Sequence, residues 1–507
     1  MSDVVFSSGT RTLSHGDLTR RGAQAATGFA SLGVTEGDAI AILLRNDLAV
    51  LEAMIGAGLI GAYAVPVNWH YLAEECGYIL KDSAAKVLLV HADLWPRVAA
   101  AVPAGVRVLT VATPPEVALA YGVEPASPED ATDWDAWRAG FQPYDGPPAA
   151  SRGSMIYTSG TTGHPKGVRR AAMTEDQQRA LIGLVTEGYG LKPGVRALMT
   201  GPLYHSAPNA YARGALTLPA SLHLMPRFDA EETLRLIEEL RISHILMVPT
   251  MFVRLLQLPD AVKRRHDLSS LEFVVHGAAP CPAEIKRRMI DWWGPVINEY
   301  YGSTEAGLIT VASSAEALAR PGTVGRALPG VEIRLLDESG LAVAPGEIGE
   351  VYVRSTRVPD FTYQNQDATR REIERDGFVT NGDLGLMDEA GYLHLRDRRR
   401  DMVISGGVNI YPAEIEAVLL DLAGVGDCAV FGIPDAEFGE ALAAAIEPAP
   451  GAELTDAEVT AYLKNHLAAF KVPRRIEFHA SLPREDSGKI FKKRLKEPYW
   501  RNAGRAI

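Results

Sequence analysis

One short segment of the chain combines the residue types that bind phosphate groups. It reads Tyr157-Thr-Ser-Gly-Thr-Thr-Gly-His-Pro-Lys166-Gly167, and the apolar residues before it are typical of a strand end. Its glycines let the backbone approach an anion closely, its hydroxyl groups can donate hydrogen bonds to phosphate oxygens, and Lys166 adds a positive charge. The pattern predicts a phosphate-binding loop, although a flexible Gly/Ser/Thr linker has the same composition. The hydroxyl and glycine residues inside the loop are Thr158, Ser159, Gly160, Thr161, Thr162 and Gly163.

Two acidic residues further along the chain have the surroundings expected of nucleotide ligands. Glu305 ends the segment Asn298-Glu-Tyr-Tyr-Gly-Ser-Thr-Glu305. A carboxylate beside hydroxyl groups suits Mg²⁺, which prefers oxygen ligands and often takes only one or two carboxylates from the protein. Asp383, in Thr380-Asn-Gly-Asp383, can accept hydrogen bonds from the two hydroxyls of a ribose. In isolation, Glu305 also fits a surface acid and Asp383 also fits an Asx turn in a β-hairpin.

Two segments later in the chain supply basic residues with the surroundings expected of a nucleotide site. The cluster Arg396-Asp-Arg-Arg-Arg-Asp401 precedes Ile404-Ser-Gly-Gly407, and Pro483-Arg-Glu-Asp-Ser-Gly-Lys489 places a lysine on a glycine turn. Alone, the cluster fits a solvated surface turn and Lys489 fits an exposed charge, as most lysines are. Each of these segments is a weak signal alone, but their joint occurrence in this order, after the phosphate-binding segment and the two acidic residues, is not.

Together these segments resemble those of the AMP-forming adenylate ligase superfamily, which includes acyl- and aryl-CoA synthetases, adenylation domains of peptide synthetases and firefly luciferase. The resemblance extends over essentially the whole chain, from Leu13-Ser-His-Gly-Asp-Leu to Gly488-Lys489. It implies that the protein uses ATP, Mg²⁺ and coenzyme A. A carboxylic acid would attack the α-phosphate of ATP to form acyl-AMP and pyrophosphate, and the thiol of coenzyme A would then displace AMP.

The resemblance also implies which residues contact the nucleotide. Glu305, with Thr158, corresponds to the magnesium ligand, and Asp383 corresponds to the ribose ligand. Lys489 corresponds to the catalytic lysine of the first half-reaction, and His205 and Glu305 join it as catalytic residues. The full set of implied ATP and AMP ligands is Thr158, Ser159, Gly160, Thr161, Thr162, Gly163, Lys166, Gly277, Ala278, Ala279, Tyr300, Tyr301, Gly302, Ser303, Thr304, Asp383 and Arg398.

A moving C-terminal domain follows from the same resemblance. Its hinge corresponds to Arg400, a position that usually holds Asp or Lys in the family. Rotation about this hinge would remove Lys489 from the site and bring in the segment that contacts coenzyme A. The implied contacts to coenzyme A are Ser405, Gly406, Gly407 and Lys471.

The identity of the acid is the least determined part of the prediction. By the resemblance, its pocket has a mixed apolar and aromatic lining, which predicts an aryl acid or a medium-sized aliphatic acid. No basic residue in this set is an obvious partner for a second carboxylate, which disfavours dicarboxylic acids. The implied lining residues are Tyr204, His205, Asn209, Tyr211, Met251, His276, Gly302 and Leu308, with Tyr300 and Ser303 at the border with the nucleotide.

Composition excludes several other classes of protein. The chain has 507 residues, of which 47% are hydrophobic and 22% charged, and its net charge is −12. Such a chain is long enough for two or more domains, and its negative charge disfavours nucleic-acid binding. The three cysteines are far apart, so neither a disulfide framework nor a zinc site is predicted. We expect a cytoplasmic enzyme without a signal peptide or an integral membrane segment, acting as a monomer or homodimer.

The elements that must position these residues alternate between helices and strands. Residues 1–100 carry helical runs with apolar strands at 39–44 and 86–90, which predicts βαβ units and a parallel sheet. Residues 101–150 suggest an irregular connection, and the alternation resumes between 195 and 310. Short β-like runs after about residue 320 predict antiparallel structure.

We therefore expect an α/β protein with a large N-terminal domain of parallel-rich α/β subdomains plus a β-rich subdomain, followed by a small mobile α+β domain. The predicted boundaries are residues 1–398 for the AMP-binding domain and 399–507 for the lid domain.

A stand-alone acid–CoA ligase is the predicted function. The first alternative is an enzyme that loads an acyl group onto a carrier protein. Against activation of amino acids, Leu203-Tyr-His-Ser206 stands where those enzymes place an Asp. A luciferase-like oxygenase has the same motifs. A catalytically inactive binding module is disfavoured because the four key residues are all present, namely Glu305, Asp383, Arg398 and Lys489.

Overall fold

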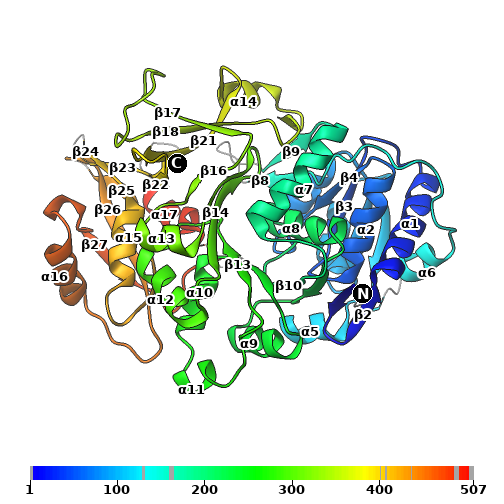
Figure 1. Ribbon diagram of the computed structural model, residues 1–507, viewed down its shortest axis with the longest axis horizontal. Helices are drawn as coiled ribbons and strands as arrows, with labels where there is room; N and C mark the ends of the chain where they lie inside the picture. The colour runs from blue at the N-terminus through cyan, green and yellow to red at the C-terminus, as the bar shows by residue number, and fades with distance from the viewer. Residues whose placement is uncertain are drawn as a thin grey trace.

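The computed structural model describes residues 4–127, 132–158, 165–399, 401–405, 408–435, 437–484 and 490–501. A large part contains two mainly parallel sheets, and a smaller part at the C-terminal end contains a sheet of its own (Figure 1). The α/β class predicted from the sequence is confirmed. The boundary between residues 398 and 399 stays a prediction.

A nine-stranded sheet forms the centre of the large part. Its inner strands are parallel and both of its edges are closed by antiparallel neighbours. In order across the sheet the strands are β16 (Arg326–Ala327), β15 (Gly307–Ala312), β14 (Ile297–Ser303), β13 (Phe273–His276), β12 (His244–Met247), β10 (Arg196–Met199), β11 (Ser221–Leu224), β1 (Val5–Ser8) and β2 (Arg11–Ser14).

A five-stranded sheet near the N-terminus is parallel throughout. Its strand β3 is buried on both faces: Ile40 and Ile42 pack into one apolar cluster, and Ala41 and Leu43 pack into another. Burial on both faces explains the continuous apolar run of this strand, because helices cover both sides of a parallel sheet. In order the strands are β4 (Tyr63–Pro66), β3 (Ala39–Leu43), β5 (Ala85–His91), β6 (Arg107–Val111) and β7 (Thr132–Asp133).

The expectation that residues 101–150 form an irregular connection was wrong. This stretch supplies the strands β6 and β7 and two helices, α5 (Pro115–Tyr121) and α6 (Trp134–Ala139). Strand β6 extends the parallel sheet beside β5, and Trp134 is fully buried. Some of the proline and aspartate residues that suggested a loop lie at helix starts: Pro115 opens α5 and Asp133 caps α6.

Two smaller sheets connect the large part to the C-terminal unit. The first has three strands, β19 (Phe361–Tyr363), β9 (Lys166–Arg170) and β8 (Ile156–Thr158). The second is antiparallel, as predicted for this region, and contains β17 (Val331–Leu336), β18 (Gly349–Ser355), β21 (Phe378–Met387), β20 (Glu374–Arg375) and β22 (Leu393–Arg398).

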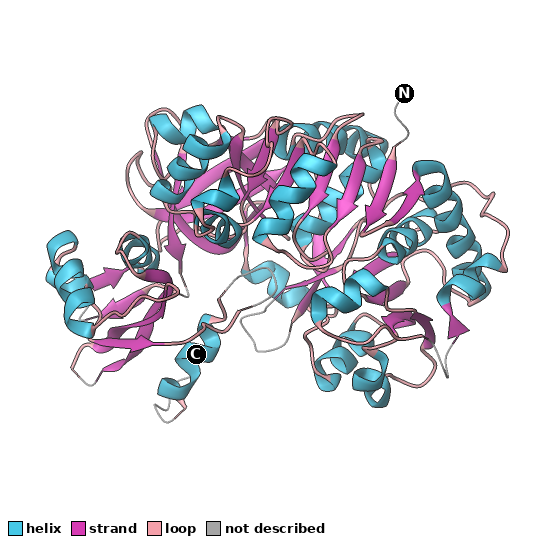
Figure 2. Ribbon diagram, turned by 90° about the horizontal axis from the view of Figure 1, so that it is seen from below, coloured by secondary structure: helices cyan, strands magenta, loops and turns pink. Residues whose placement is uncertain are grey.

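The C-terminal unit has its own sheet and its own apolar cluster, which includes Val403, Ile415, Val430 and Leu463. Figure 2 shows this unit as a separate lobe at the lower left. Its strands are β24 (Val408–Ile410), β23 (Val403–Ser405), β26 (Gly439–Pro448), β25 (Val425–Asp435) and β27 (Arg475–Phe478).

Helices cover the sheets on both sides in Figure 1. Helix α15 begins at Pro412, as the sequence predicts, because proline fits the first turn of a helix. Helix α7 begins after Thr174, whose side chain accepts a hydrogen bond from the backbone of Gln177. The helices not yet named are α1 (His15–Ser31), α2 (Leu48–Leu59), α3 (Ala73–Asp82), α4 (Trp95–Val98), η1 (Ala99–Ala101), α7 (Glu175–Tyr189), α8 (Ser206–Thr217), α9 (Ala230–Glu239), α10 (Pro249–Leu256), α11 (Asp260–Lys263), α12 (Ala283–Trp293), α13 (Ser314–Ala319), α14 (Asp367–Glu372), α15 (Pro412–Leu420), α16 (Asp456–His466), η2 (Ala469–Lys471) and α17 (Lys492–Trp500).

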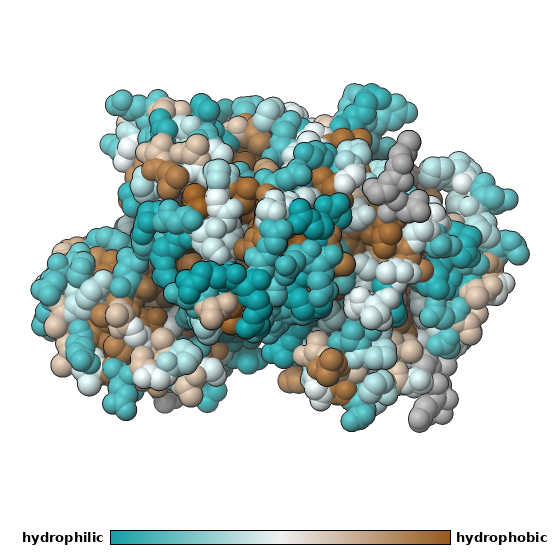
Figure 3. Space-filling view, turned by 60° about the horizontal axis from the view of Figure 1, so that its bottom comes forward, coloured by the Kyte–Doolittle hydropathy of each residue, from teal (hydrophilic) through white to brown (hydrophobic). Residues whose placement is uncertain are grey.

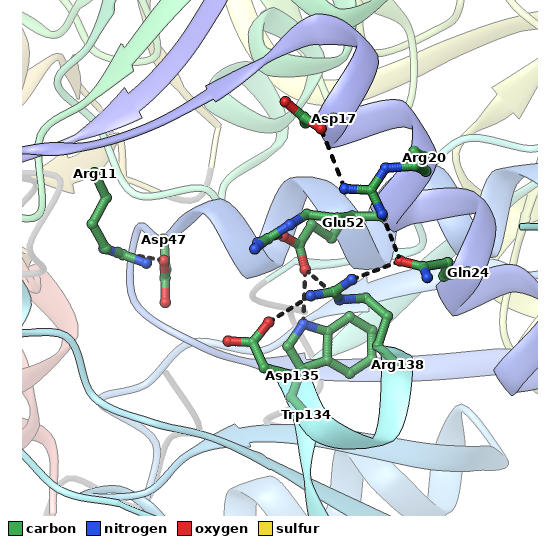
Figure 4. A network of polar contacts seen from close by, with 10 residues as sticks. Arg11, Asp17, Arg20, Gln24, Asp47, Glu52, Trp134, Asp135 and Arg138 are labelled. Carbon is green, nitrogen blue, oxygen red and sulfur yellow. Dashed lines mark hydrogen bonds and ion pairs between the residues drawn. The ribbon is translucent and has the colours of Figure 1, made fainter. Parts of the chain in front are cut away.

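A buried polar network ties three helices of the N-terminal region together (Figure 4). Glu52 of α2 is 2% exposed, and its carboxylate accepts hydrogen bonds from Arg21 (2.8 Å) and from the indole of Trp134 (2.9 Å). Arg138 of α6 lies 3.2 Å from the same carboxylate and donates to Gln24 of α1 (2.9 Å). We call Glu52 and these four partners the α2 network. Every charge in it has an opposite charge or a hydrogen-bond partner, so its role is to join the helices.

Hydrophilic side chains predominate on the face drawn in Figure 3, where hydrophobic residues form separate patches. Within the described ranges, the structure contains no helix with the length and apolar character needed to cross a membrane.

Candidate active site

A cleft of about 2900 Å³ is lined by residues of the large part and of the C-terminal unit. It is bordered by the ends of β8 and β9, by helices α7 and α8, by residues 278–283 and by β14 and β21. From the C-terminal unit, α15 and the start of α17 reach the same cleft. The cleft therefore brings together segments that are more than three hundred residues apart in the sequence.

The predicted phosphate-binding segment joins two antiparallel strands. Thr158 ends β8 and pairs with Lys166, which begins β9, and both residues line the cleft. Lys166 is only 5% exposed, so it is a buried cation on a strand rather than a mobile charge on a loop. Its Nζ lies 5.7 Å from the ring centre of Tyr363, and within the described part of the chain no carboxylate pairs with it. Ser159, Gly160, Thr161, Thr162 and Gly163 lie outside the described residues.

Two residues, Tyr301 and Arg398, contact the carboxylate of Asp383. Its Oδ2 accepts a hydrogen bond from Tyr301 of β14 (2.7 Å), and its Oδ1 lies 3.3 Å from Nε of Arg398 of β22. Burial, together with the charge of Asp383, raises the pKa of Tyr301, so the tyrosine remains a hydrogen-bond donor. Asp383 lies within strand β21 rather than in a hairpin turn, and Gly382 before it adopts a φ of 74° at a bulge. The bulge turns the carboxylate toward Tyr301 and the cleft.

Glu305 lines the cleft beside a second tyrosine. The hydroxyl of Tyr363 donates to Oε1 of Glu305 (3.0 Å), and Arg170 donates to the backbone carbonyls of Thr304 (2.6 Å) and Glu305 (2.9 Å). Burial raises the pKa of Glu305, and the hydrogen bond from Tyr363 and the charge of Arg170 oppose that rise. Arg170 thus fixes the backbone that carries the carboxylate.

Glu305 fits a magnesium ligand. The described residues contain no group of three or more His, Cys, Asp or Glu side chains that could hold a metal ion by themselves. Magnesium on a nucleotide needs only one or two protein carboxylates, because phosphate and water supply its other ligands. Glu305 keeps one carboxylate oxygen without a protein hydrogen bond among the described contacts, and the hydroxyl-bearing Thr158 borders the same cleft.

The segment predicted to contact adenine contains a strained residue. Ala278 has a φ of 66°, a conformation that glycine adopts more readily, and such strain is concentrated at functional sites. At Gly277, a Cβ atom would lie 2.5 Å from the ring and from the carbonyl oxygen of Tyr300, so only glycine allows this packing. Ala278, Ala279 and the predicted ligands from Tyr300 to Thr304 line the cleft, whereas Gly277 does not.

The predicted acid pocket is only partly in contact with the cleft. Tyr204, His205, Asn209, Met251, Gly302 and Leu308 line it. Tyr211 and His276 do not, and both are fully buried. His276 packs against Phe252, and burial lowers the pKa of its imidazole well below the ordinary value.

Asn46 is a site-positioning residue that the sequence analysis missed. It is 1% exposed and donates hydrogen bonds to the carbonyls of Gly201 (2.9 Å) and Met225 (3.0 Å). Its Oδ1 accepts a hydrogen bond from the backbone of Leu203 (2.9 Å), two residues before His205. The sequence contains a feature that could have identified Asn46. The polar run Arg45-Asn46-Asp47 directly follows an apolar strand, and ligand sites are frequent at the carboxyl ends of parallel strands.

The C-terminal unit presents basic residues to the cleft. Lys492 of α17 forms an ion pair with Glu416 of α15 (2.7 Å), and nearby acids raise the pKa of Lys492 to about 12 although burial opposes this. Lys471 lines the cleft and pairs with Glu414, whereas Ser405 does not reach the cleft. Arg400, Gly406, Gly407 and Lys489 lie outside the described residues.

This arrangement defines a nucleotide-dependent enzyme: a carboxylate held by a tyrosine and an arginine, a second carboxylate and a buried lysine face one cleft. Comparison with known protein families also indicates a nucleotide-dependent enzyme. The profile of the AMP-binding enzyme family matches residues 2–359, and the profile of the AMP-binding enzyme C-terminal domain matches residues 414–489.

The chain is also similar to individual enzymes over nearly its full length. It is 36% identical over 495 residues to a feruloyl-CoA synthase of an Amycolatopsis species, covering 96% of this chain and 93% of that protein. It is 31% identical over 507 residues to the fatty acid–[acyl-carrier-protein] ligase ScoC of Streptomyces coeruleorubidus, covering 98% and 93%. Its structure matches that of the anthranilate CoA ligase AuaEII in complex with anthranoyl-AMP with a TM-score of 0.86, 25% identity, and coverage of 99% and 95%. The chain belongs to the AMP-binding enzyme family and, within it, to the acyl-CoA synthetases.

Proposed function

We propose that this enzyme is a carboxylic acid–CoA ligase that acts through an acyl-AMP intermediate. The observation that carries the proposal is one cleft lined by Glu305, by Asp383 with its partner Tyr301, and by basic residues of the C-terminal unit. In this proposal, residues 1–398 bind ATP and the acid, and residues 399–507 form a lid that moves between the two half-reactions.

The nucleotide would be held through its ribose and phosphates. Asp383 accepts hydrogen bonds from the ribose hydroxyls, and Arg398 and Tyr301 orient its carboxylate. Lys166 neutralises the phosphates that leave as pyrophosphate. Glu305 and Thr158 would hold Mg²⁺, which supplies charge neutralisation at the phosphates when bound.

The chemical steps would be divided between two positions of the lid. In the first, the acid carboxylate attacks the α-phosphate and Lys489 stabilises the negative charge that spreads over both groups. In the second, the lid rotates about Arg400, and Ser405, Gly406, Gly407 and Lys471 border the path of the thiol. The sulfur then bonds to the acyl carbon, and AMP leaves with the bonding electrons.

The acid is proposed to be an aryl acid or a medium-sized aliphatic acid. The part of the pocket formed by Tyr204, Met251 and Leu308 is apolar and aromatic, which suits either class. Similarity to enzymes named for feruloyl and fatty acyl groups supports the same range.

A panel of carboxylic acids with ATP, Mg²⁺ and coenzyme A tests the proposal. We expect AMP release together with the mass of an acyl-CoA thioester for at least one aryl or medium-chain acid. AMP release without any thioester across the panel would contradict the ligase function.

The variant Lys489→Ala tests whether Lys489 acts in adenylation and not in thioester formation. Adenylation, followed by acid-dependent exchange of pyrophosphate into ATP, should fall by about 10²–10³-fold or more. Thioester formation from synthetic acyl-AMP should be retained. Lys464→Ala, an exposed lysine of α16, is the matched control and should retain both reactions. Equal loss of both half-reactions in Lys489→Ala would contradict the lid assignment.

A carrier protein is the second candidate acceptor, because the chain is similar to a ligase named for that acceptor. Coenzyme A and a phosphopantetheinylated carrier protein should therefore be compared at equal concentrations. A higher kcat/KM with coenzyme A supports the proposal, and a higher value with the carrier protein replaces it with this second candidate.

A further inference from the structure

Arg213 of α8 is a cation at the cleft wall with no acidic partner. Its guanidinium makes one described hydrogen bond, from Nη2 to the hydroxyl of Ser151 (2.9 Å), and both residues line the cleft. Within the described part of the chain no carboxylate lies within ion-pair distance of it. Burial lowers the pKa of Arg213, and no neighbouring acid opposes this effect.

The other arginine on this side of the cleft has a different environment. Arg179 of α7 is exposed and pairs with Asp176 (2.5 Å) and, more distantly, with Glu175 (3.8 Å). An exposed ion pair of this kind contributes little to stability. A largely buried cation without a partner is costly to the fold, so its retention calls for a ligand that supplies the missing charge.

The part of the cleft around Arg213 also has apolar lining residues. It runs between α7 and α8, which lie side by side in Figure 1, and residues 148–151 border it. Leu181, Ile182 and Val185 of α7 form one wall, and Ala210 of α8 lies on the other. These apolar side chains suit a chain or ring, and Arg213 offers it a positive charge that, unlike that of Arg179, has no carboxylate partner among the described residues.

Helix geometry sets the distance between Arg213 and the reacting end of the acid. His205 is the N-cap of α8, Asn209 lies one turn further along, and Arg213 follows one turn after that. Eight residues of α-helix span about 12 Å. A group that reaches Arg213 would thus lie on the order of 10 Å from a carboxylate bound beside His205.

We propose that Arg213 forms a distal anion subsite and that the preferred acids carry a second carboxylate or a similar anionic group at their far end. This inference rests on the proposed ligase function and specifies its substrate class. It reverses the expectation that dicarboxylic acids are disfavoured. That expectation rested on a set of pocket residues that did not include Arg213.

Matched pairs of acids test the subsite. Each α,ω-diacid from adipate to sebacate is compared with the monoacid of equal length, and 4-carboxycinnamate is compared with cinnamate. In the unmodified enzyme we expect kcat/KM for the best diacid or carboxylated aryl acid to exceed that of its partner by at least about tenfold. Arg213→Met should lower this ratio on the order of 10²-fold, because the second carboxylate would enter an apolar pocket unpaired. Arg213→Lys should recover part of the ratio.

Arg179→Met is the matched control, since it removes an arginine of the same cleft wall that already has partners. Its ratios should equal those of the unmodified enzyme. Three outcomes would overturn the subsite while leaving the ligase function intact. They are equal kcat/KM values within the pairs, a preference for the monoacids, and a diacid-to-monoacid ratio that Arg213→Met leaves unchanged. Absence of AMP release with both members of every pair would contradict the ligase function and the subsite together.

Discussion

Buried charges occur in two regions of this molecule, and the two regions differ in how those charges are paired. In the α2 network, the carboxylate of Glu52 meets two arginines and an indole N–H. Around the cleft, Lys166 is buried and Arg213 is half-buried, and among the described residues neither has a carboxylate partner. Burial of charge is costly unless partners replace water. The first region therefore has its partners built into the fold, and in the second we propose that the nucleotide and the acid supply the negative charge.

Arg170 is intermediate between these two kinds of buried charge, because its hydrogen-bond partners are backbone carbonyls. Its guanidinium donates to three backbone carbonyls, those of Pro359, Thr304 and Glu305. Burial lowers its pKa to about 10, and the nearby carboxylate of Glu305 acts in the opposite direction. Arg170 supports the cleft from behind, so its substitution should affect both stability and activity.

The largest expected effect is in the α2 network. Glu52→Gln removes the carboxylate shared by the buried Arg138 and by Arg21, whose side chain is 31% exposed. The free energy of unfolding should fall by about 3–5 kcal/mol, measured by urea denaturation, while kcat stays unchanged below the transition. Glu332→Gln, which breaks an exposed pair with Arg354, should cost at most about 1 kcal/mol. Equal costs for the two variants would contradict the role given to burial.

Lys166→Met should lower activity without lowering stability, whereas Glu52→Gln should lower stability without lowering kcat. We expect kcat/KM for ATP to fall about 10²–10³-fold, because an electrostatic contact to the phosphates is lost. The free energy of unfolding should stay the same or rise, since the variant removes a buried charge that has no carboxylate partner. A loss of stability comparable to that of Glu52→Gln would show that Lys166 is a structural cation instead.

The pH dependence of stability should identify Asp47 as a paired charge. Burial favours its neutral form, but hydrogen bonding and charge from His91, with Arg11, hold its pKa at about 2, below the ordinary 3.8. A depressed carboxyl pKa stabilises the fold above the ordinary value, and the contribution is lost as the pH falls toward 2. Asp47→Asn should therefore cost about 2 kcal/mol at pH 7, and the difference from the unmodified protein should shrink between pH 4 and pH 2. A difference that does not change over this range would exclude the ion pair as its cause.

The smallest expected effect concerns the hydroxyl of Tyr363, which donates to Glu305. Tyr363→Phe removes one hydrogen bond to a charged group but keeps the ring beside Lys166. Because such a bond contributes roughly 1–2 kcal/mol, kcat/KM for Mg–ATP should fall about five- to thirtyfold. Unchanged kinetics would indicate that Glu305 is oriented by its backbone alone, through Arg170.

Local patterns predicted most of the regular structure and failed where composition resembled a loop. The apolar runs at residues 39–44 and 86–90 became β3 and β5, because burial on both faces of a parallel sheet demands such runs. Residues 101–150 were misjudged, since their strand is short and their helices begin with proline or follow aspartate. Asp383 was expected on a turn, but pairing of β21 with β22 holds it within a strand. Strand pairing depends on distant residues and is invisible in the local pattern.

The order of the motifs from the phosphate-binding segment to Lys489 was sufficient to identify the family and the nucleotide, because these residue types reflect the chemistry of ATP and vary little with the acid. The partners of each charge depended on the fold. Only the packing of α1, α2 and α6 pairs Glu52 with Arg138, and only the position of α8 beside α7 places Arg213 at the cleft without an acid. Both arginines are alike in the sequence. Their roles differ because ion pairing requires groups within a few ångströms of each other, and tertiary structure sets those distances.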